Sequence, residues 1–325
     1  MVFCIQNTTN RTRQVITGYH RACVKMRTST FSNANMSKIA RPAKSTPAWL
    51  DSMYNNRALV PDHARHFVQW ADASEDAREA HICLSNIAYG DGPMETLDVF
   101  PAKQANSPVM VFIHGGYWRS LDKSDHSFIA PAFVNEGACV VVPNYALCPA
   151  VTIPEIALQM VKALVWTYRH VAQHGGDPER ITVIGHSAGG HLAAMILSCL
   201  WKQVDKSLPA DLVKDAMSIS GLYDLEPIMK TPFLKESLRL TPAQVKLASP
   251  AYFKAPKHGK LYALAGADES AEFIRHNQLI QDAWGKKKVP VCELVPQRNH
   301  FSIVEDLSAP WTELHKLAVA MVKAA

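Results

Sequence analysis

The sequence predicts an α/β fold, with a mostly parallel, doubly wound sheet and helices on both of its faces, from three observations. From about residue 80 onward, short apolar runs alternate with longer amphipathic stretches. The runs VMVFI, ACVVV and ITVI are apolar at every position, which is typical of strands buried on both faces of a parallel sheet. The 325 residues are 48% hydrophobic, enough for one large domain and too apolar for a disordered chain.

The expected elements alternate between strand and helix, as parallel crossovers require. We expect strands at 81–87, 96–100, 109–113, 138–142, 181–184, 216–220, 261–265 and 291–295. We expect helices at 123–136, 154–174, 189–202, 271–284 and 310–323. The segment 222–258 is rich in proline and interrupts the alternation, so it predicts a small cap-like insertion above the sheet.

The positive charge of the chain is concentrated in residues 1–45. Eight of the 34 Lys and Arg residues precede Asp51 and none of the 29 acidic residues does, so the rest carries 26 basic residues and a net charge of −3, against +5 overall. We expect residues 1–45 to be a poorly ordered extension and 46–325 to form a single domain. The extension is a transit peptide, a segment upstream of a start at Met36, or an ordered arm, and the sequence leaves these alternatives open.

Charge and composition also limit the partners. A mildly acidic body argues against binding to nucleic acid, and residues 1–40 contain neither a secretory signal nor an apolar run of membrane-spanning length. We therefore expect a cytoplasmic protein with a small-molecule substrate and no nucleic-acid or membrane partner; the sequence is compatible with a homodimer. The seven cysteines stand singly and no H-E-x-x-H motif occurs, so neither a disulfide framework nor a metal site is expected.

The strongest chemical motif lies where the strand 181–184 meets the following helix. There the sequence reads G-H-S-A-G-G at 185–190, a G-x-S-x-G motif between an apolar strand and an apolar helix. Flanking glycines permit a turn sharp enough to hold a serine hydroxyl above the sheet, at the positive end of the helix. The pattern predicts Ser187 as a nucleophile, and the N–H of Ala188 as a donor to an oxyanion.

A glycine-containing loop, H-G-G-Y-W at 114–118, follows the strand 109–113. In acyl-transfer enzymes of this architecture such a loop brings backbone N–H groups close to the developing oxyanion. We expect the N–H groups of Gly116 and Tyr117 to join Ala188 in this role. His114 and Gly115 should brace the loop, and Trp118 should line the substrate pocket.

Two late strand ends are expected to supply the acid and the base, in the chain order serine, acid, histidine. The strand 261–265 ends in G-A-D-E-S at 266–270, which predicts Asp268 as the acid. The last strand leads to His300, which we expect to be the general base, oriented by the acid. Asp224, which also follows a strand, is the alternative acid.

Five motifs together resemble the α/β-hydrolase family and are most similar to its kynurenine formamidase (arylformamidase) branch. They are H-G-G-Y-W at 114–118, G-H-S-A-G-G at 185–190, S-G-L-Y-D-L at 220–225, G-A-D-E-S at 266–270 and N-H-F at 299–301. The resemblance extends from about Tyr89 to the C-terminus. Tyr117 stands where the related esterases usually carry a third glycine, so this loop is more specific than the serine motif.

The resemblance implies an α/β-hydrolase fold and hydrolysis of N-formyl-L-kynurenine to L-kynurenine and formate in tryptophan degradation. The reaction would pass through a formyl-enzyme on Ser187 and would need no metal or organic cofactor. Trp118, Tyr223 and Phe301 would then suit the aryl group. Two alternatives stay open: a carboxylesterase acting on short-chain or aryl esters, and a non-catalytic binding protein built on the hydrolase scaffold. The three filled triad positions argue against the second.

Overall fold

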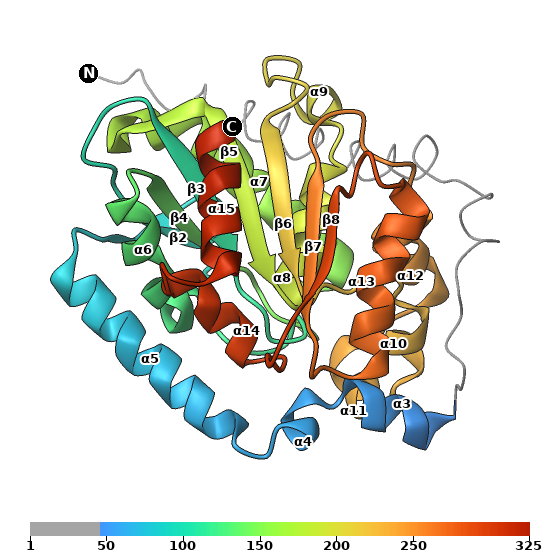
Figure 1. Cartoon of the computed structure of the whole chain (residues 1–325). Helices are drawn as coiled ribbons and strands as arrows, with labels where there is room; N and C mark the ends of the chain where they lie inside the picture. Colours follow the sequence, from blue (N-terminus) through green and yellow to red (C-terminus); the bar gives the residue numbers. More distant parts are fainter. Residues whose placement is uncertain (1–45) are drawn as a thin grey trace, which may run out of the picture.

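The computed structural model describes residues 46–325 and contains one eight-stranded sheet (Figure 1). The strand order is β1-β2-β4-β3-β5-β6-β7-β8, so β3 and β4 are exchanged in the sheet relative to their order in the chain. Residues 1–45, for which a transit peptide, a segment upstream of a later start and an ordered arm are the alternatives, lie outside the described residues.

All eight expected strands are present, and only β2 runs against the direction of the others. This confirms the predicted mostly parallel α/β sheet. The strands are β1 (Leu84–Ala88), β2 (Thr96–Phe100), β3 (Ser107–Ile113), β4 (Cys139–Pro143), β5 (Gly176–His186), β6 (Val213–Ile219), β7 (Leu261–Gly266) and β8 (Val291–Val295).

Alternating side chains of the buried strands build two hydrophobic clusters, one on each face of the sheet. In β3, Val109 and Val111 belong to one cluster, whereas Met110 and Phe112 belong to the other. The first cluster includes residues of α7 (Ile153–His170), α8 (Ala188–Leu197), α9 (Trp201–Val204) and α13 (Ala271–Trp284). The second includes residues of η1 (Lys123–Ile129), α6 (Ala130–Asn135), α14 (Ser302–Glu305), η4 (Asp306–Ser308) and α15 (Glu313–Ala324).

Several of the expected helices are divided into shorter pieces by proline or glycine residues. The helix expected at 123–136 is a 3-10 turn followed by α6, which begins at Ala130 with a proline in its first turn. The helix expected at 154–174 ends as the 3-10 turn η2 (Val171–His174) at Gly175, whose φ of 80° is left-handed. The expected insertion 222–258 contains α10 (Glu226–Lys230), α11 (Pro232–Leu238), α12 (Pro242–Leu247) and the 3-10 turn η3 (Pro250–Tyr252).

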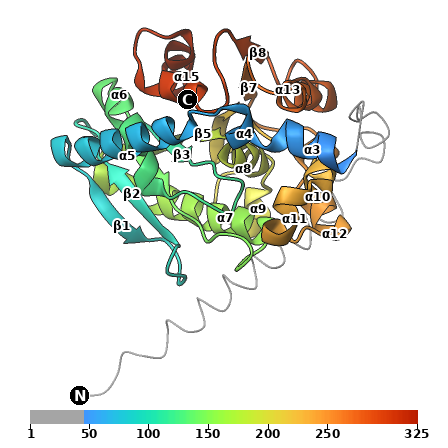
Figure 2. The ribbon, with the colours of Figure 1, turned by 90° about the horizontal axis from the view of Figure 1, so that it is seen from below.

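Three helices that the sequence analysis did not predict cross the carboxyl ends of the strands. They are α3 (Pro47–Tyr54), α4 (Asn56–Leu59) and α5 (His63–Ala80), drawn in blue in Figures 1 and 2. We call residues 47–80 the cap segment. Figure 2 shows this segment lying across the end of the sheet, with α10 and α11 beside α3. The cover above the sheet therefore has two parts, the cap segment and the helices of the insertion 222–258.

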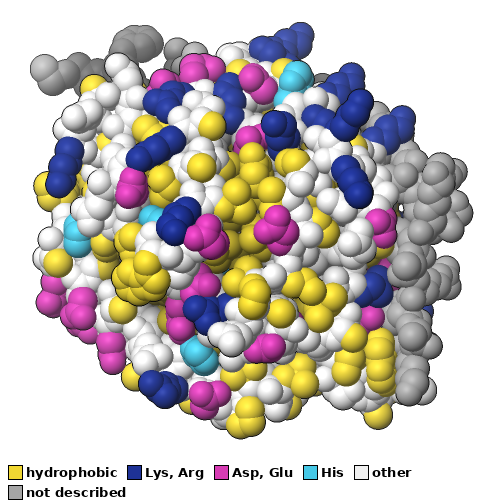
Figure 3. Space-filling view, viewed as in Figure 1, with side chains coloured by type: hydrophobic (Ala, Val, Ile, Leu, Met, Phe, Trp, Pro, Cys, Tyr) yellow, Lys and Arg dark blue, Asp and Glu magenta, His cyan; other side chains and the backbone are white. Residues whose placement is uncertain are grey.

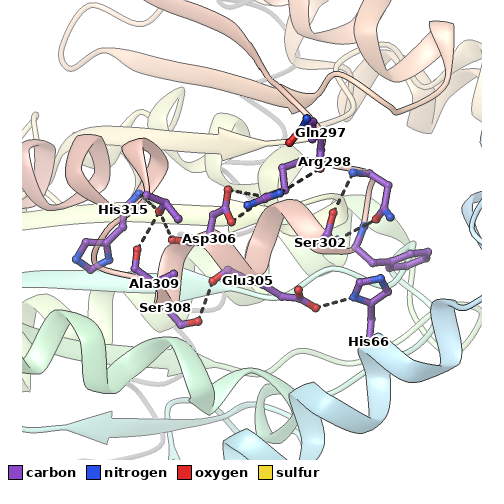
Figure 4. Close-up of polar contacts among 12 residues, drawn as sticks. His66, Gln297, Arg298, Ser302, Glu305, Asp306, Ser308, Ala309 and His315 are labelled. Carbon is purple, nitrogen blue, oxygen red and sulfur yellow. Dashed lines mark hydrogen bonds and ion pairs between the residues drawn. The ribbon is translucent and has the colours of Figure 1, made fainter.

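Polar contacts fix the cap segment to the body at both ends. In α3, the Tyr54 hydroxyl donates to Glu272 Oε2 over 2.6 Å. In α5, His66 Nδ1 lies 2.6 Å from Glu305 Oε1 of α14, as Figure 4 shows, and Trp70 Nε1 donates to the same oxygen over 3.0 Å. Farther along α5, Arg78 donates to the backbone oxygen of Ser124 over 2.6 Å.

The outer edge of the sheet at β8 is partly open. Figure 3 shows apolar side chains gathered between α13 and α15, over β7 and β8. Leu294 of β8 is 42% exposed there. No helix within residues 46–325 combines the length and the apolar character needed to span a membrane.

Candidate active site

Ser187 occupies a sharp turn between the end of β5 and the start of α8. Its φ of 57° and ψ of −117° are strained for a residue with a side chain. A Cβ at Gly185 would lie 2.1 Å from the oxygen of Gly189, and one at Gly189 would lie 1.9 Å from that of Ile113. Because neither position tolerates a side chain, the two glycines of the motif allow the turn that holds the serine.

Ser187 and His300 lie side by side, as the sequence predicted, and a buried carboxylate completes a chain of hydrogen bonds. His300 Nε2 is 3.0 Å from Ser187 Oγ, and His300 Nδ1 is 2.6 Å from Glu269 Oε2. The Glu269 side chain is fully buried, and His300 is 5% exposed. A serine, a histidine and an acid in this order and at these distances form the arrangement that activates a serine nucleophile.

The carboxylate paired with His300 belongs to Glu269, which corrects the prediction of Asp268. The chain turns tightly after β7, and the N–H of Glu269 donates to the oxygen of Gly266 over 3.2 Å. This turn directs Asp268 to the surface, where it is exposed and its N–H bonds to the oxygen of Arg298 over 3.1 Å. Glu269, with a side chain longer by one methylene, reaches back to the histidine.

The alternative acid, Asp224, is buried but does not contact His300. It accepts hydrogen bonds from the Tyr252 hydroxyl over 2.6 Å and from the N–H of Glu226 over 3.0 Å. Burial raises the pKa of the Asp224 carboxyl. Asp224 therefore stabilises the turn before α10.

Two further donors satisfy the Glu269 carboxylate. Its Oε1 accepts a short hydrogen bond from the Ser220 hydroxyl and a second, of 2.7 Å, from the N–H of Gly266. Ser220 follows β6 with a left-handed φ of 53°, which is uncommon for serine. A buried carboxylate needs such partners, because leaving its oxygens unpaired would be costly. Ser220 was not predicted as a site residue, although it lies in the S-G-L-Y-D-L motif.

His186, next to the serine, positions the histidine loop. Its Nε2 lies 2.8 Å from the backbone oxygen of His300, and the two rings are 4.9 Å apart. Burial, followed by the charge of His300, holds the pKa of His186 well below its ordinary value. His186 is therefore neutral and donates through Nε2 to that carbonyl.

The H-G-G-Y-W loop packs directly against the serine turn. A Cβ at Gly115 would lie 3.1 Å from Ser187 Cβ. The Tyr145 hydroxyl donates to the oxygens of His114 and Gly115 over 2.9 and 3.1 Å, and its ring stacks on that of His114 at 4.2 Å. His114 is fully buried and lies 3.0 Å from the side-chain oxygen of Asn144. These contacts hold His114 and Gly115 in place at the start of the loop; their bracing role stays a prediction.

The expected oxyanion donors lie in the backbone around Ser187. Gly116 and Tyr117 have left-handed φ values of 102° and 50°, and both line the same cavity as the serine. Ala188 is the first residue of α8, where backbone N–H groups have no acceptor inside the helix. The role of these three N–H groups as donors to an oxyanion on the serine stays a prediction.

A cavity of about 450 Å³ opens over Ser187 and His300. This volume is within the usual range for small-molecule sites. Its walls come mainly from the cap segment and the loop after β3, and the rings of five Phe, Tyr and Trp residues contribute. The lining residues are Asn55, Asn56, Arg57, Ala58, His63, Phe67, Trp70, Gly116, Tyr117, Arg119, Ser120, Leu121, His186, Ser187, Phe233, His300 and Phe301.

Of the three residues expected to contact the aryl group, Trp118, Tyr223 and Phe301, only Phe301 lines this cavity. Trp118 is fully buried and packs edge-on against His191, with the ring centres 4.9 Å apart. Tyr223 is also fully buried, and its hydroxyl donates to Ser218 over 2.7 Å. Both are core residues, which corrects their placement in the pocket.

The aromatic walls come instead from Phe67 and Trp70 of α5 and from Phe233 of α11. None of the three was predicted from the sequence, because they lie in helices whose position above the sheet depends on long-range contacts. Within residues 46–325, no cluster of three or more His, Cys, Asp or Glu side chains is arranged to hold a metal ion.

Comparisons with known proteins find relatives over most of the chain. The BD-FAE family model matches residues 97–268, just over half of the chain. The kynurenine formamidase of Danio rerio is 30% identical over 280 residues, covering 83% of this chain and 93% of that protein. The kynurenine formamidase of Drosophila melanogaster is 27% identical over 277 residues, covering 82% and 89%.

Solved structures share the fold. A Silicibacter sp. crystal structure, provisionally named a thioesterase, has a TM-score of 0.73 and 29% identity, and covers 85% of this chain and 99% of that one. The Pyrobaculum calidifontis esterase has a TM-score of 0.59 and 18% identity, covering 79% and 90%.

Proposed function

Because the chain belongs to the α/β-hydrolase family, in its kynurenine formamidase branch, we propose that this hydrolase of the formamide and ester type is an arylformamidase. Its proposed substrate is N-formyl-L-kynurenine and its products are L-kynurenine and formate. The observation that carries the proposal is the hydrogen-bonded chain from Ser187 through His300 to Glu269, at the base of an aromatic-walled cavity.

In the first half-reaction, Ser187 Oγ attacks the formyl carbon while His300 Nε2 accepts the hydroxyl proton. The N–H groups of Gly116, Tyr117 and Ala188 stabilise the resulting oxyanion. The C–N bond then breaks, and His300 returns the proton to the departing aryl amine. The formyl group stays on the serine as an ester.

In the second half-reaction, water attacks this ester and His300 accepts its proton. The bond between the formyl carbon and Oγ breaks, the serine regains a proton from His300, and formate leaves. Glu269 holds the imidazole in the tautomer that presents Nε2 to the serine, and it stabilises the imidazolium formed twice in each cycle.

The cavity walls support an aryl substrate. Phe67, Trp70, Phe233 and Phe301 surround the space above the serine with apolar rings. Aromatic surfaces pack favourably against an aryl ketone. A formyl group needs little room beside the serine, so most of the cavity is available for the amine side of the substrate.

The direct test compares kcat/KM for N-formyl-L-kynurenine with that for 4-nitrophenyl acetate on one preparation. We expect the formamide to be preferred, although the ester is intrinsically more reactive. A strong preference for the ester would overturn the proposal and favour a carboxylesterase, the second candidate, which the likeness to esterase structures supports. A cytoplasmic role in tryptophan degradation follows from the same proposal.

A further inference from the structure

One part of the cavity wall carries hydrogen-bond donors and positive charge. Arg57 comes from α4, and Arg119 follows the H-G-G-Y-W loop. No Asp or Glu is among the described residues that line the cavity. Two cations without a compensating acid at a substrate site favour an anionic group on the substrate.

Neighbouring groups hold both guanidinium groups in place. Arg119 Nη1 donates to the oxygen of Phe233 over 3.1 Å and to Ser237 Oγ over 2.8 Å, and its Cζ lies 5.3 Å from the centre of the Phe233 ring. Arg57 Cζ lies 5.2 Å from the centre of the Phe67 ring. Burial and then the charge of Arg57 lower the pKa of Arg119, so the two cations are close enough to repel each other.

A third donor lies beside them. Asn56 is 5% exposed and lines the cavity, and its side-chain nitrogen has no hydrogen-bond partner among the described residues. An unpaired buried donor destabilises a protein unless a ligand supplies the acceptor. An amide N–H beside two guanidinium groups matches the acceptor-only chemistry of a carboxylate.

We propose that Asn56, Arg57 and Arg119 form a subsite for a substrate carboxylate, so that the enzyme selects aryl formamides carrying an acid group on the amine side. The inference rests on the proposed function, since N-formyl-L-kynurenine carries a carboxylate in that position. The described lining residues offer no acid to an ammonium group, so the carboxylate is what the site recognises and the α-amino group is dispensable.

Three substrates test this selectivity: N-formyl-L-kynurenine, its des-amino analogue that keeps the carboxylate, and neutral 2-acetylformanilide. We expect kcat/KM for each acid to exceed that for the neutral compound about tenfold or more, the range for hydrogen bonds to charged groups. The two acids should differ by less than about threefold. Equal kcat/KM for the acids and the neutral compound would overturn the subsite, as would loss of turnover on removing the amino group.

Substitutions of the two arginines test whether they cause the preference for acidic over neutral substrates. Arg57→Glu and Arg119→Gln should each lower the acid-to-neutral ratio of kcat/KM about tenfold, mainly through KM, whereas Arg57→Lys should keep most of it. Arg65→Gln, at an exposed arginine of α5 outside the cavity lining, is the matched control and should keep the ratio. Arg57 is exposed, so its replacement tests the subsite even if Arg119→Gln disturbs α11. An unchanged ratio in both Arg57→Glu and Arg119→Gln would refute the assignment.

A binding experiment separates this inference from the proposed function. L-kynurenine and its methyl ester are compared as competitive inhibitors of 4-nitrophenyl acetate hydrolysis, which requires no formamidase activity. We expect the free acid to bind about tenfold more tightly, a difference that Arg57→Glu removes. Tight binding of the free acid without turnover of N-formyl-L-kynurenine would support the subsite and overturn the proposed function. Efficient turnover of N-formyl-L-kynurenine, with equal inhibition constants for the acid and its methyl ester, would support the proposed function and overturn the subsite.

Discussion

The carboxyl edge of the sheet and the cap segment above it build the same site by different means. At the sheet edge, Ser187 and Glu269 are positioned by backbone: a turn with two obligatory glycines in one case, a tight turn after β7 in the other. In the cap segment, Phe67 and Trp70 are positioned by side-chain contacts such as that of Trp70 with Glu305. Local backbone geometry therefore positions the catalytic side chains, and long-range side-chain packing shapes the substrate cavity.

The largest effect is expected at the sheet edge. Ser187→Ala removes the nucleophile and should lower kcat by about 10⁴-fold or more, because the remaining groups cannot replace it. KM should change little, since most of the cavity wall comes from the cap segment and the loop after β3 and not from Ser187. Single-turnover rates with N-formyl-L-kynurenine check this, with thermal unfolding as the control for folding. Residual activity above a few per cent of the native enzyme would exclude Ser187 as the nucleophile.

The next prediction separates two adjacent acids. Glu269→Gln keeps the shape but removes the charge opposite His300, and should lower kcat about 10³- to 10⁴-fold. Asp268→Asn, at the exposed neighbour, is the matched control and should stay within about threefold of the native enzyme. Steady-state kinetics of both variants decide the assignment. If Asp268→Asn caused the larger loss, the turn after β7 would have to differ from the one described.

In the cap segment, a substitution in the cavity wall is expected to raise KM more than it lowers kcat. Phe67→Ala removes an aromatic wall of the cavity and should raise KM for an aryl formamide about tenfold, with a smaller change in kcat. Val68→Ala, at the next residue of α5, is 59% exposed and serves as the control. Kinetics on one aryl formamide compare the two. A loss confined to kcat would show that the cap segment also positions the catalytic groups.

The smallest effect concerns the junction between cap segment and body. His126 of η1 is fully buried, with its ring centre 5.5 Å from that of Trp70, and burial, followed by the charge of His114, lowers its pKa to about 3. A histidine kept neutral by folding contributes stability above its unfolded pKa, about 6.5, and this stability is lost as the pH falls from there toward 3.

His126→Phe should therefore reduce the slope of the free energy of unfolding against pH, between about pH 6 and 4, by up to about 1 kcal/mol per pH unit. Urea unfolding across that range measures the slope. The slope should be positive in both proteins, because other buried histidines, such as His191 with a pKa lowered to about 4, remain. An unchanged slope would mean that His126 titrates alike in the folded and unfolded states.

The same contrast explains what could be predicted from the sequence. Ser187 and His300 were identifiable because each lies in a motif at a strand end, where the fold itself determines position. The acid was placed one residue too early, because which side chain of G-A-D-E-S turns inward depends on the turn after Gly266 and not on residue type.

Trp118 and Tyr223 were placed in the pocket because aromatic residues near a catalytic motif suit a pocket and a core equally well. In the structure both are fully buried. The cap segment could not be predicted at all, because α5 buries only Trp70, Ser74 and Ala77, a stripe too narrow to give a strong helical pattern. Its position depends on partners such as Glu272 and Glu305, more than 200 residues away in the chain.

The most direct test of the catalytic assignment is to map a covalent adduct. The native protein is treated with a fluorophosphonate, which reacts with activated serines, and the labelled peptide is identified by mass spectrometry. The geometry predicts one adduct, on Ser187, and its loss in His300→Ala, because the imidazole 3.0 Å from Oγ activates the hydroxyl. A folded protein that carried no label on Ser187, or that carried it equally without His300, would contradict the assignment.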